Sequence, residues 1–542
     1  MYNIKADYKI NTNKLYIMIW LMVSLYPLLV VPGSLPYFYG PRYIFLAILS
    51  LITAALLFLK QLKLNQSVYR QLLIFLLFAL VSTLLSADIL NAWGGSDIRF
   101  TGLSTYIFCA VMFVAASKIN DSGKILKAMV IVAALVSVTA ILQHFGINIV
   151  PHEAFREHFH SYGTLGNPNF LGTYTVFIMP ASIMLYFNEK HIRWLIVSAL
   201  IFAALLTSMT RGAWLAFAVI FMIIVYYVWK NPQLKNYLFK LAIVLLAVFF
   251  FISFTNNQLV FKRSATVSSE IEAALELDDS AGSNRVLIWK ETLKRIPQAW
   301  AFGVGPDSLR IPMAQNYSED KAFNIFLEIA ATMGLFALIA YLVFLYYCLR
   351  ERRRDWLGTT FAFMVLAYLL QGQFNIDVIM NLPLFWITLG LMQSKTAIDL
   401  RIISETSPKD AVIDGKRKKM VNEKRVIILM VTGIAIFIIF IALMFLFPRQ
   451  GSIEVEGQGV YTGQLRGSTF HGYGTWEATN GVVYQGDFKH GYFDGYGTMT
   501  FINGSQYSGE FKEGYFHGQG HLITADGQII EGTWENGNRI DP

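Results

Sequence analysis

The sequence has few charged residues and almost no cysteine. Only 15% of its 542 residues are charged and 55% are hydrophobic, whereas a soluble domain carries about 25% charged residues. This deficit excludes a soluble cytosolic enzyme, a disordered regulator and a collagen-like chain. The two cysteines, Cys109 and Cys348, lie in apolar runs and offer neither a disulfide framework nor a metal-ligand spacing.

The net charge of +8 is the average of two different compositions. Residues 451–542 hold 11 acidic and four basic residues, a net charge of −7, which leaves +15 on the rest of the chain. The same segment holds 20 of the 40 glycines. The positive charge therefore does not indicate nucleic-acid binding, and no nucleic acid is expected as a partner.

The chain before residue 450 is a series of apolar runs separated by mostly short polar loops. A helix that crosses the bilayer core needs about 20 apolar residues. We therefore predict thirteen transmembrane helices, near residues 15–32, 37–59, 70–86, 102–117, 126–143, 170–187, 193–208, 212–229, 237–254, 324–348, 357–371, 377–393 and 426–447.

The basic residues of alternate short loops predict the orientation in the plasma membrane, because cytoplasmic loops are rich in Lys and Arg. The N-terminus is expected in the cytoplasm, together with a basic linker at 396–425. The long loop at about 255–322 and the C-terminal domain, 451–542, are expected on the outer face. Each loop assigned to the cytoplasm contains Lys or Arg, for example Lys118, Lys190 and Arg350.

A few arginines remain at or beside the other outer loops, namely Arg42, Arg99, Arg156 and Arg211. A cation at the membrane edge is costly unless it reaches the interface or has a partner. For any single arginine, snorkelling to the interface or pairing with an acid explains the residue about as well as a functional role does. Several arginines on one face favour a shared anion such as phosphate, which the planar guanidinium binds in a bidentate manner.

The loop between the fifth and sixth runs contains two histidines, at 158 and 160, followed by Gly166-Asn167-Pro168-Asn169. This motif favours a turn, after which Asn169 is expected to cap the next helix. Turn and cap alone explain the asparagines, and the histidines are also explained as interfacial residues.

The long outer loop is expected to contain an acidic helical stretch, Ser268 to Asp279, and a second helix opened by residues 283–289, with Arg285 in its first turn. The apolar stripe of the second helix is Val286, Trp289, Leu293 and Ile296. Ser318 is a candidate cap for the tenth run. Glu328 lies inside that run and is a functional candidate; an ion pair with Arg211 or Arg285 is the alternative.

The order of these motifs resembles a known family. Gly95-x-x-x-Arg99-x-x-Gly102 follows the third run, the Gly-Asn-Pro-Asn motif precedes the sixth, and Thr210-Arg211-Gly212-Ala213-Trp214 precedes the eighth. Asn284-Arg285-x-x-x-Trp289, a Gly-x-Gly turn at 303–305 and Asn324 come later in order. Over about residues 15–395 the chain resembles the O-antigen ligase and Wzy-type polymerase superfamily, which includes bacterial O-oligosaccharyltransferases.

The resemblance implies a GT-C-like helical fold and an inverting, metal-independent glycosyltransferase without a cofactor. Such enzymes transfer a glycan from an undecaprenyl-diphosphate-linked donor to an acceptor hydroxyl, on a glycan or lipid-linked glycan, at the outer face of the plasma membrane. It implies that Arg211 and Arg285, and less strongly Arg99, bind the diphosphate. His160, Asn167, Asn169 and Asn324 are the further candidates for substrate binding, and Glu328 for catalysis.

One position departs from the family pattern. The family has His-Asn at the start of the span after the long loop, with the His as general base, and here Phe323 precedes Asn324. Three explanations stay open. Another group acts as base (Glu319, Asp320, Glu328 or a loop histidine such as His160), the acceptor needs no strong base, or the protein is not a catalyst.

The C-terminal segment repeats with a period of 23 residues. Tyr461, Tyr484, Tyr507 and Ile530 hold equivalent positions, and glycines and aromatic residues recur in phase with them. The pattern resembles the MORN repeat over about residues 458–538. It predicts an all-β domain of hairpins in which the recurring aromatics form the core. A surplus face with Tyr473, Tyr492, Phe493, Tyr496 and Tyr515 is a candidate surface for cell-wall glycan or a protein partner.

The sequence thus predicts an all-α polytopic membrane domain, 1–395, with membrane lipids around it, followed by an outer MORN-repeat domain. The favoured function is polymerisation or ligation of a cell-surface polysaccharide, and an aromatic outer domain that could hold a growing polymer favours polymerase. The alternatives are a catalytically impaired scaffold that recruits partners through the repeats, and glycan transfer to protein. A transporter shares the span count but predicts broken helices at the midplane and inverted repeats, which the sequence does not suggest.

Overall fold

The computed structural model describes residues 2–30, 38–58, 67–96, 99–150, 161–255, 258–265, 276, 278, 281–312, 318–394, 449–455, 459–466, 469–489 and 491–541. The chain divides into two compact units, and each is treated by itself below. The first unit comprises residues 1–261 and 284–422, and the second comprises residues 262–283 and 423–542. Below, the helical unit means the described residues of the first, and the β unit means residues 449–541 of the second. The predicted linker 396–425 and the thirteenth run, 426–447, lie outside the described residues.

Each of the first twelve predicted runs coincides with one described helix, except that the tenth coincides with two. Among the described residues, six helices are long and apolar enough to cross a membrane, counting α10 with the short helix before it (Pro232–Ser253). The described helices are α1 (Tyr2–Leu25), α2 (Gly40–Phe58), α3 (Ser67–Leu85), α4 (Ile89–Gly94), α5 (Leu103–Ala116), α6 (Ser122–His144), α7 (Pro168–Glu189), α8 (Ile192–Thr207), α9 (Arg211–Trp229), α10 (Lys235–Ser253), α11 (Leu259–Ala265), α13 (Ala281–Arg295), α14 (Ile325–Thr332), α15 (Gly334–Arg350), α16 (Trp356–Gln371) and α17 (Leu382–Met392). The predicted all-α membrane fold is confirmed, and the number of spans stays a prediction.

Helix α7 is the buried centre of the helical unit. Its apolar 18-residue window is completely buried, and it packs against α8, α9 and α16. Peripheral helices such as α2 are buried on one face only. In α2, Leu46 and Thr53 are buried, and the exposed face carries Ile44, Ile48 and Leu51. A helix that exposes large aliphatic side chains at helical spacing has the face that lipid requires. The helical unit is therefore that of a membrane protein.

The tenth predicted run is not one helix. It breaks at Met333 into α14 and α15, because Gly334 has φ +86° and a Cβ there would lie 2.1 Å from the carbonyl oxygen of Ala301. The backbone amides of Val304 and Gly305 donate to α14 carbonyl oxygens at the break. The predicted Gly-x-Gly turn thus seats the long loop on a helix break, which apolar periodicity alone did not reveal.

Arg42, one of the arginines beside the loops predicted to be on the outer face, has a structural role. It is fully buried and donates to the backbone carbonyls of Tyr26, Pro27, Phe38 and Thr164 at 2.8–3.1 Å. These bonds satisfy the guanidinium completely enough to explain its burial. Arg42 is therefore set aside as a ligand-binding residue.

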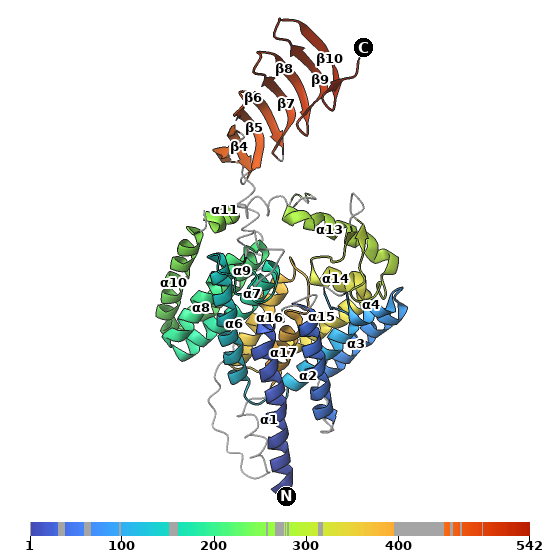
Figure 1. Cartoon of the computed structure of the whole chain (residues 1–542), viewed down its shortest axis with the longest axis vertical. Coiled ribbons are helices and arrows are strands. Elements are labelled where there is room, and N and C mark those ends of the chain that lie inside the picture. The colour runs from blue at the N-terminus through green and yellow to red at the C-terminus, as the bar shows by residue number, and fades with distance from the viewer. Residues whose placement is uncertain are drawn as a thin grey trace. The chain divides into compact units, whose positions relative to one another are not determined.

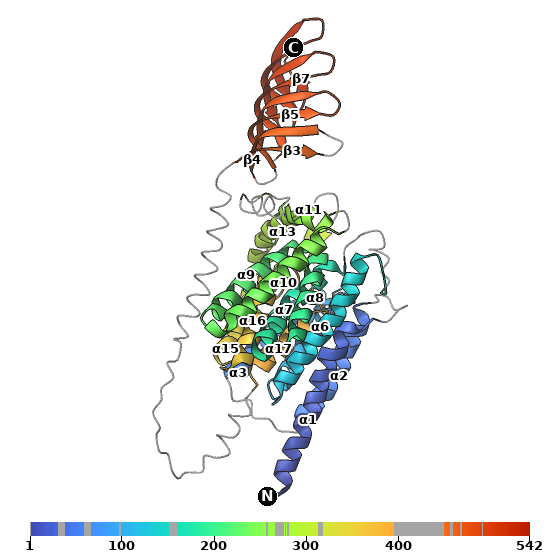
Figure 2. The ribbon, with the colours of Figure 1, turned by 90° about the vertical axis from the view of Figure 1, so that its left-hand side faces the viewer.

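The β unit is a nine-stranded antiparallel meander in which every strand pairs with its sequence neighbour. Figures 1 and 2 show these strands following one another in a single twisted sheet. The strands are β3 (Arg449–Val455), β4 (Gly459–Arg466), β5 (Thr469–Ala478), β6 (Val483–Lys489), β7 (Tyr492–Thr500), β8 (Gln506–Lys512), β9 (Tyr515–Ile523), β10 (Ile529–Glu535) and β11 (Asn538–Arg539). The predicted all-β repeat fold is confirmed.

The repeating tyrosines form the core of the β unit, as predicted. Tyr461, Tyr484 and Tyr507 are fully buried, and each stacks on a phenylalanine of the next strand, with ring centroids 3.8–4.2 Å apart. One of these partners is Phe493. Its assignment to the exposed face was therefore wrong, because Phe493 packs on the core. The four tyrosines predicted on that face are exposed.

Candidate functional site

Four segments that are distant in sequence meet around the turn at residues 371–375. The first is the start of α7. Asn167 caps this helix, and its Oδ1 accepts a hydrogen bond from the backbone amide of Asn169 at 2.8 Å. The expectation that Asn169 is the cap was wrong, because Pro168 already occupies the first helical position, which proline favours. The Asn169 carbonyl instead accepts a hydrogen bond from Asn375 Nδ2 at 3.1 Å.

The second segment is the start of α9, where Arg211 is half-buried. Thr210 Oγ1 donates to the carbonyl oxygen of Pro168 at 3.1 Å, which fixes this helix start on that of α7. On the other side, a Cβ at Gly212 would lie 2.9 Å from Cβ of Phe374. Arg211 therefore sits on a backbone held between the start of α7 and the 371–375 turn, in the first turn of α9, where the helix dipole favours anions.

The third segment begins α14. Asn324 Oδ1 accepts hydrogen bonds from the amides of Phe326 and Leu327 at 3.0 and 3.2 Å, and its Nδ2 donates to Gln373 Oε1 at 3.2 Å. Asn324 is the N-cap, so the expectation for Ser318 was wrong. Ser318 lies in the two-residue strand β2 (Ser318–Glu319), which pairs with β1 (Ile311–Pro312).

The fourth segment is α13, which Figure 1 shows lying across one end of the helical unit. The Arg285 guanidinium carbon lies 5.6 Å from the ring centroid of Phe323, within cation–π range. Phe323 has φ +50°, an uncommon conformation for a bulky residue. One turn further along α13, the Trp289 ring is 6.3 Å from that of Phe374. Arg285 thus lies beside the position of the family histidine, on a helix that contacts the 371–375 turn through Trp289.

Two expectations for α13 need correction. The helix begins at Ala281, so Arg285 lies in its second turn and not in its first. Leu293, expected in the apolar stripe, is 54% exposed, whereas Ile288 and Thr292 are buried. The reason is that α13 packs Ile288 against a small core formed by the strands of the loop and by α14.

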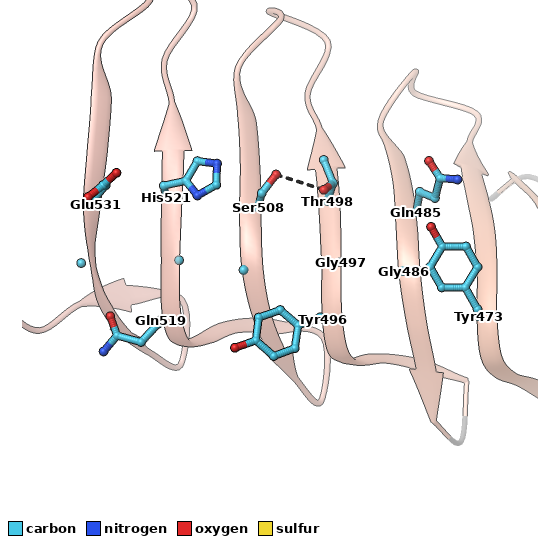
Figure 3. A pocket seen from close by; sticks show the side chains of 13 residues that line it. Tyr473, Gln485, Gly486, Tyr496, Gly497, Thr498, Ser508, Gln519, His521 and Glu531 are labelled. Carbon is cyan, nitrogen blue, oxygen red and sulfur yellow. Dashed lines mark hydrogen bonds between the residues drawn. The ribbon is translucent and has the colours of Figure 1, made fainter.

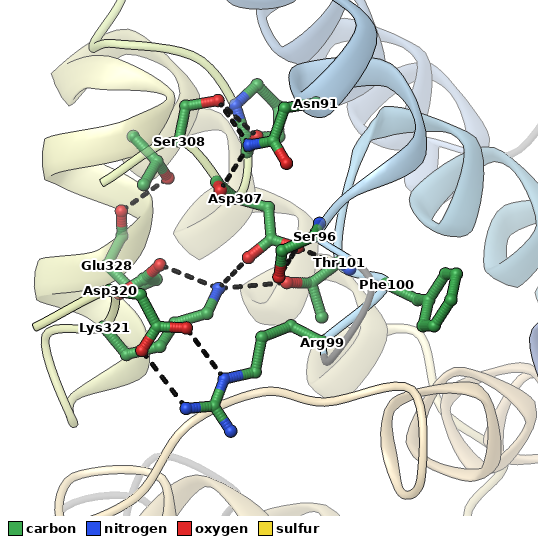
Figure 4. Close-up of polar contacts among 12 residues, drawn as sticks. Asn91, Ser96, Arg99, Phe100, Thr101, Asp307, Ser308, Asp320, Lys321 and Glu328 are labelled. Atoms are coloured by element: carbon green, nitrogen blue, oxygen red, sulfur yellow. Dashed lines mark hydrogen bonds and ion pairs between the residues drawn. The ribbon is translucent and has the colours of Figure 1, made fainter. Parts of the chain in front are cut away.

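A buried charge cluster adjoins the site (Figure 4). Lys321 is 2% exposed, and its Nζ lies 2.6 Å from Asp307 Oδ1, 3.1 Å from Glu328 Oε1 and 3.0 Å from Thr101 Oγ1. Glu328 therefore has an ion-pair partner, and it is Lys321 and neither of the two arginines proposed. Its second oxygen accepts the amide hydrogen of Ala322 at 2.7 Å.

Asp307 links this cluster to the loop that carries Arg99. Its Oδ2 accepts hydrogen bonds from the amides of Ser96 and Thr101 at 2.8 and 3.1 Å. Burial alone would raise the pKa of Asp307, but the Lys321 charge and these amides outweigh burial and hold the pKa below its usual value. The same balance, with Asp307 as the main partner, keeps the pKa of the buried Lys321 above its usual value.

Arg99 forms an ion pair with an acid, which is one of the explanations that the sequence left open for it. Its Nε and one terminal nitrogen donate to the two carboxylate oxygens of Asp320 at 3.0 and 3.1 Å (Figure 4). Burial would lower the pKa of Arg99, and the bidentate bonds and charge of Asp320 raise it above the usual value. The Asp320 side chain is 39% exposed, so this pair borders solvent.

The structure thus gathers around the 371–375 turn the segments that carry five predicted residues, namely Arg211, Arg285, Asn167, Asn169 and Asn324; Asn169 and Asn324 contact the turn directly. Arg99 and Glu328 lie in the adjoining charge cluster, and His160 lies outside the described residues. Sequence reasoning missed Lys321, Asp307 and Gln371. Gln371 is fully buried, and neither atom of its amide has a hydrogen-bond partner among the described residues; its oxygen would lie 3.3 Å from a Cβ at Gly212. The signal for Lys321 was a basic residue in a loop assigned to the outer face.

Among the described residues, no group of three or more His, Cys, Asp or Glu side chains is placed to hold a metal ion. The acidic side chains of the charge cluster bind Lys321 and Arg99 instead.

Comparison with known proteins finds a matching family for a segment in each part of the chain. Residues 196–342, from α8 into α15, match the family described as O-antigen ligase. Residues 461–483, 484–506 and 507–529 each match the MORN repeat. No curated protein matches the chain. The predicted resemblance is confirmed, and the ligase match contains Arg211, Arg285, Asn324 and Glu328, which supports a role in ligation or polymerisation of glycans at a membrane.

Proposed function

We propose that this protein transfers a glycan from an undecaprenyl-diphosphate-linked donor to an acceptor hydroxyl at the outer face of the plasma membrane. The observation that carries the proposal is that the segments of both arginines pack on one turn, since Gly212 and Trp289 both lie against Phe374. Both arginines lie within the O-antigen ligase match. Two guanidinium groups beside a helix start suit a diphosphate, which they bind through paired N–H donors.

In the proposed reaction, the acceptor oxygen attacks the anomeric carbon from the side opposite the diphosphate. The bond between that carbon and the diphosphate oxygen breaks, the configuration inverts, and the departing diphosphate carries the electron pair. Arg211 and Arg285 stabilise the charge that develops on it, as fixed cations do most effectively where little water competes. No step uses a metal ion or a cofactor.

Phe323 cannot accept the proton of the acceptor hydroxyl, so this proton must pass to a carboxylate or to water once the new bond is forming. An attack on an oxocarbenium-like carbon needs little activation of the hydroxyl, so a weak base suffices. Glu328 is committed to Lys321 and to the Ala322 amide, which favours a positioning role for it. Asp320 is the more accessible carboxylate, with a 39% exposed side chain three residues before Phe323.

The test is deletion of the gene followed by analysis of surface polysaccharide and of carrier-linked glycan. We expect undecaprenyl-linked units to accumulate and the polymer to disappear, and the wild-type gene to restore it. Arg211→Ala and Arg285→Ala should each lower the rate about 100-fold or more, the usual effect of removing one transition-state donor. Arg310→Ala, which alters an exposed arginine of the same loop, is the matched control. Unchanged polymer in both arginine variants would refute the assigned roles.

Phe323 favours a second candidate function, a scaffold whose transferase centre is inactive. Its ring lies against Arg285, where the family histidine would act. A scaffold predicts that deletion leaves the pool of carrier-linked glycan unchanged. If that pool rises on deletion, the scaffold hypothesis fails.

A further inference from the structure

A row of paired glycines crosses the sheet of the β unit. Glycines face one another across consecutive strand pairs from β4 to β10, in the order Gly463, Gly474, Gly486, Gly497, Gly509, Gly520 and Gly532. Core packing explains several of them, because a Cβ at Gly497 would lie 2.3 Å from the hydroxyl oxygen of Tyr484. On the opposite face of the sheet, the backbone of this row is the floor of an open groove.

The groove has a volume of about 560 Å³, within the range of ligand-binding pockets. Figure 3 shows its walls as two rows of side chains on either side of the glycines. One row contains Tyr473, Tyr496 and Gln519, and the other contains Gln485, Thr498, Ser508, His521 and Glu531. The two tyrosines are 55% and 62% exposed, so their rings are accessible to a ligand.

The chemistry of these walls fits a carbohydrate. Exposed tyrosine rings stack on the C–H faces of sugars, and amide, hydroxyl, imidazole and carboxylate groups pair with sugar hydroxyls. Among the described lining residues there is no lysine or arginine, and the segment 451–542 has a net charge of −7. An anionic lipid headgroup or a nucleic acid would need basic residues here, so the charge favours a neutral or amino sugar.

The repeat also fits a polymer better than a small molecule. Each repeat adds two strands, and strands lie about 4.8 Å apart, so equivalent positions recur about every 9.6 Å along the groove. This is close to the length of two sugar rings in a chain. Tyr473 and Tyr496 are separated by one period of 23 residues and therefore meet successive disaccharides in the same way. We propose that this groove binds a linear glycan composed of neutral or amino sugars.

This binding is an activity separate from transfer, since it uses no residue of the helical unit. The probe is fluorescently labelled surface polysaccharide purified from the cells that produce the protein, titrated against the full-length chain in detergent. We expect the double variant Tyr473→Ala, Tyr496→Ala to bind about tenfold more weakly, because exposed aromatic side chains contribute much of such contacts. The matched control is Tyr492→Ala, Tyr515→Ala, which removes two tyrosines of similar exposure, 59% and 60%, that do not line the groove.

The control variant should bind as the wild type does, and thermal unfolding should be the same for all three proteins, which excludes misfolding. The Arg211→Ala, Arg285→Ala variant should also bind normally, so a failure of the proposed transferase would leave this result intact. The proposal is overturned if the wild type does not bind the polysaccharide, or if both tyrosine pairs weaken binding equally. It is also overturned if vesicles of phosphatidylglycerol compete for the groove as strongly as unlabelled polysaccharide does.

Discussion

Replacing Lys321 by methionine tests the energetics of the charge cluster most directly. Methionine keeps the apolar stem of the side chain and removes the ammonium group that pairs with Asp307 and Glu328. The carboxylate side chain of Asp307 is 1% exposed and that of Glu328 is 11% exposed. The substitution therefore leaves two buried carboxylates without their cation, which is far more harmful than losing an ion pair at the surface.

The size of the effect follows from the contacts that remain. Breaking a buried pair costs about 3–5 kcal/mol. Asp307 keeps two backbone amide donors and Glu328 keeps one, so we expect the lower limit, about 3 kcal/mol. Lys294→Met is the control, because Lys294 pairs with Glu291 while 70% exposed, and such surface pairs contribute below about 1 kcal/mol.

The effect should depend on pH in a direction that the structure fixes. In the wild type the pKa of Asp307 is lowered, so its contribution is present above the unfolded pKa, about 3.9, and is lost only as the pH falls below that. Without Lys321, burial should raise the pKa of this carboxyl above its unfolded value. The folded variant then binds protons more readily than the unfolded chain, and its deficit shrinks on acidification.

Thermal unfolding of the purified full-length chain in detergent, at pH 7 and pH 5, measures both quantities. We expect Lys321→Met to unfold about 5 °C or more below the wild type at pH 7, given a few degrees for each kcal/mol. The difference should be smaller at pH 5. A deficit equal at the two pH values, or no larger than that of Lys294→Met, would contradict the assignment of a buried ion pair.

Three further substitutions have defined outcomes. Asn324→Ala should destabilise the helical unit by about 1 kcal/mol through loss of a helix cap. Asn324→Asp should restore thermal stability, because aspartate also caps a helix. It should not restore polymer formation, because a carboxylate cannot donate a hydrogen bond to the 371–375 turn. Gly334→Val should abolish stable expression, since its Cβ would meet the carbonyl of Ala301 at φ +86°. Gly146→Ala meets a similar backbone strain, at φ +83°, but has nothing within 4 Å of its Cβ. It should still be expressed, as membrane fractions analysed by gel filtration would show. Tyr484→Phe removes a 2.9 Å hydrogen bond to a backbone carbonyl and should destabilise the β unit by about 1 kcal/mol. Thermal unfolding followed by circular dichroism measures this effect. An unchanged melting temperature would mean that the bond makes no net contribution to stability.

Most of the fold could be predicted because its signals are local. Apolar runs of membrane length and a 23-residue period identify helices and hairpins directly. The break at Gly334 was missed because α14 and α15 are both apolar, and the break depends on contact with Ala301 and with the amides of Val304 and Gly305. A partner more than 25 residues away leaves no trace in apolar periodicity. The exposure of Leu293 was missed for the same reason.

The candidate site could be predicted only in part. Arg211, Arg285 and Asn324 stand out through motif and topology, and the structure brings them to one turn. Lys321 and Asp307 did not stand out, because charged residues in a polar loop are usually solvated and only folding reveals their burial. The partner of Glu328 is Lys321, seven residues before it in the chain. From the sequence, Arg211 or Arg285 is the predicted partner instead, because these arginines lie in motifs. Which basic residue pairs with a buried acid depends on how the loop folds, and the spacing of residues in the sequence does not reveal this.

The charge cluster and the candidate site share one short segment, residues 320–324. Its first two residues bind the loop around Arg99 and Asp307 through ion pairs. Its last two contact Arg285 and Gln373. Both cysteines of the chain are free and buried, so no disulfide fixes these loops to one another. Removing one partner of a buried ion pair leaves the other charge uncompensated, and here it also frees the segment that the pair holds. We therefore expect Lys321→Met to lose more transfer activity than its loss of stability alone explains, because the segment that positions Arg285 would no longer be held from both sides.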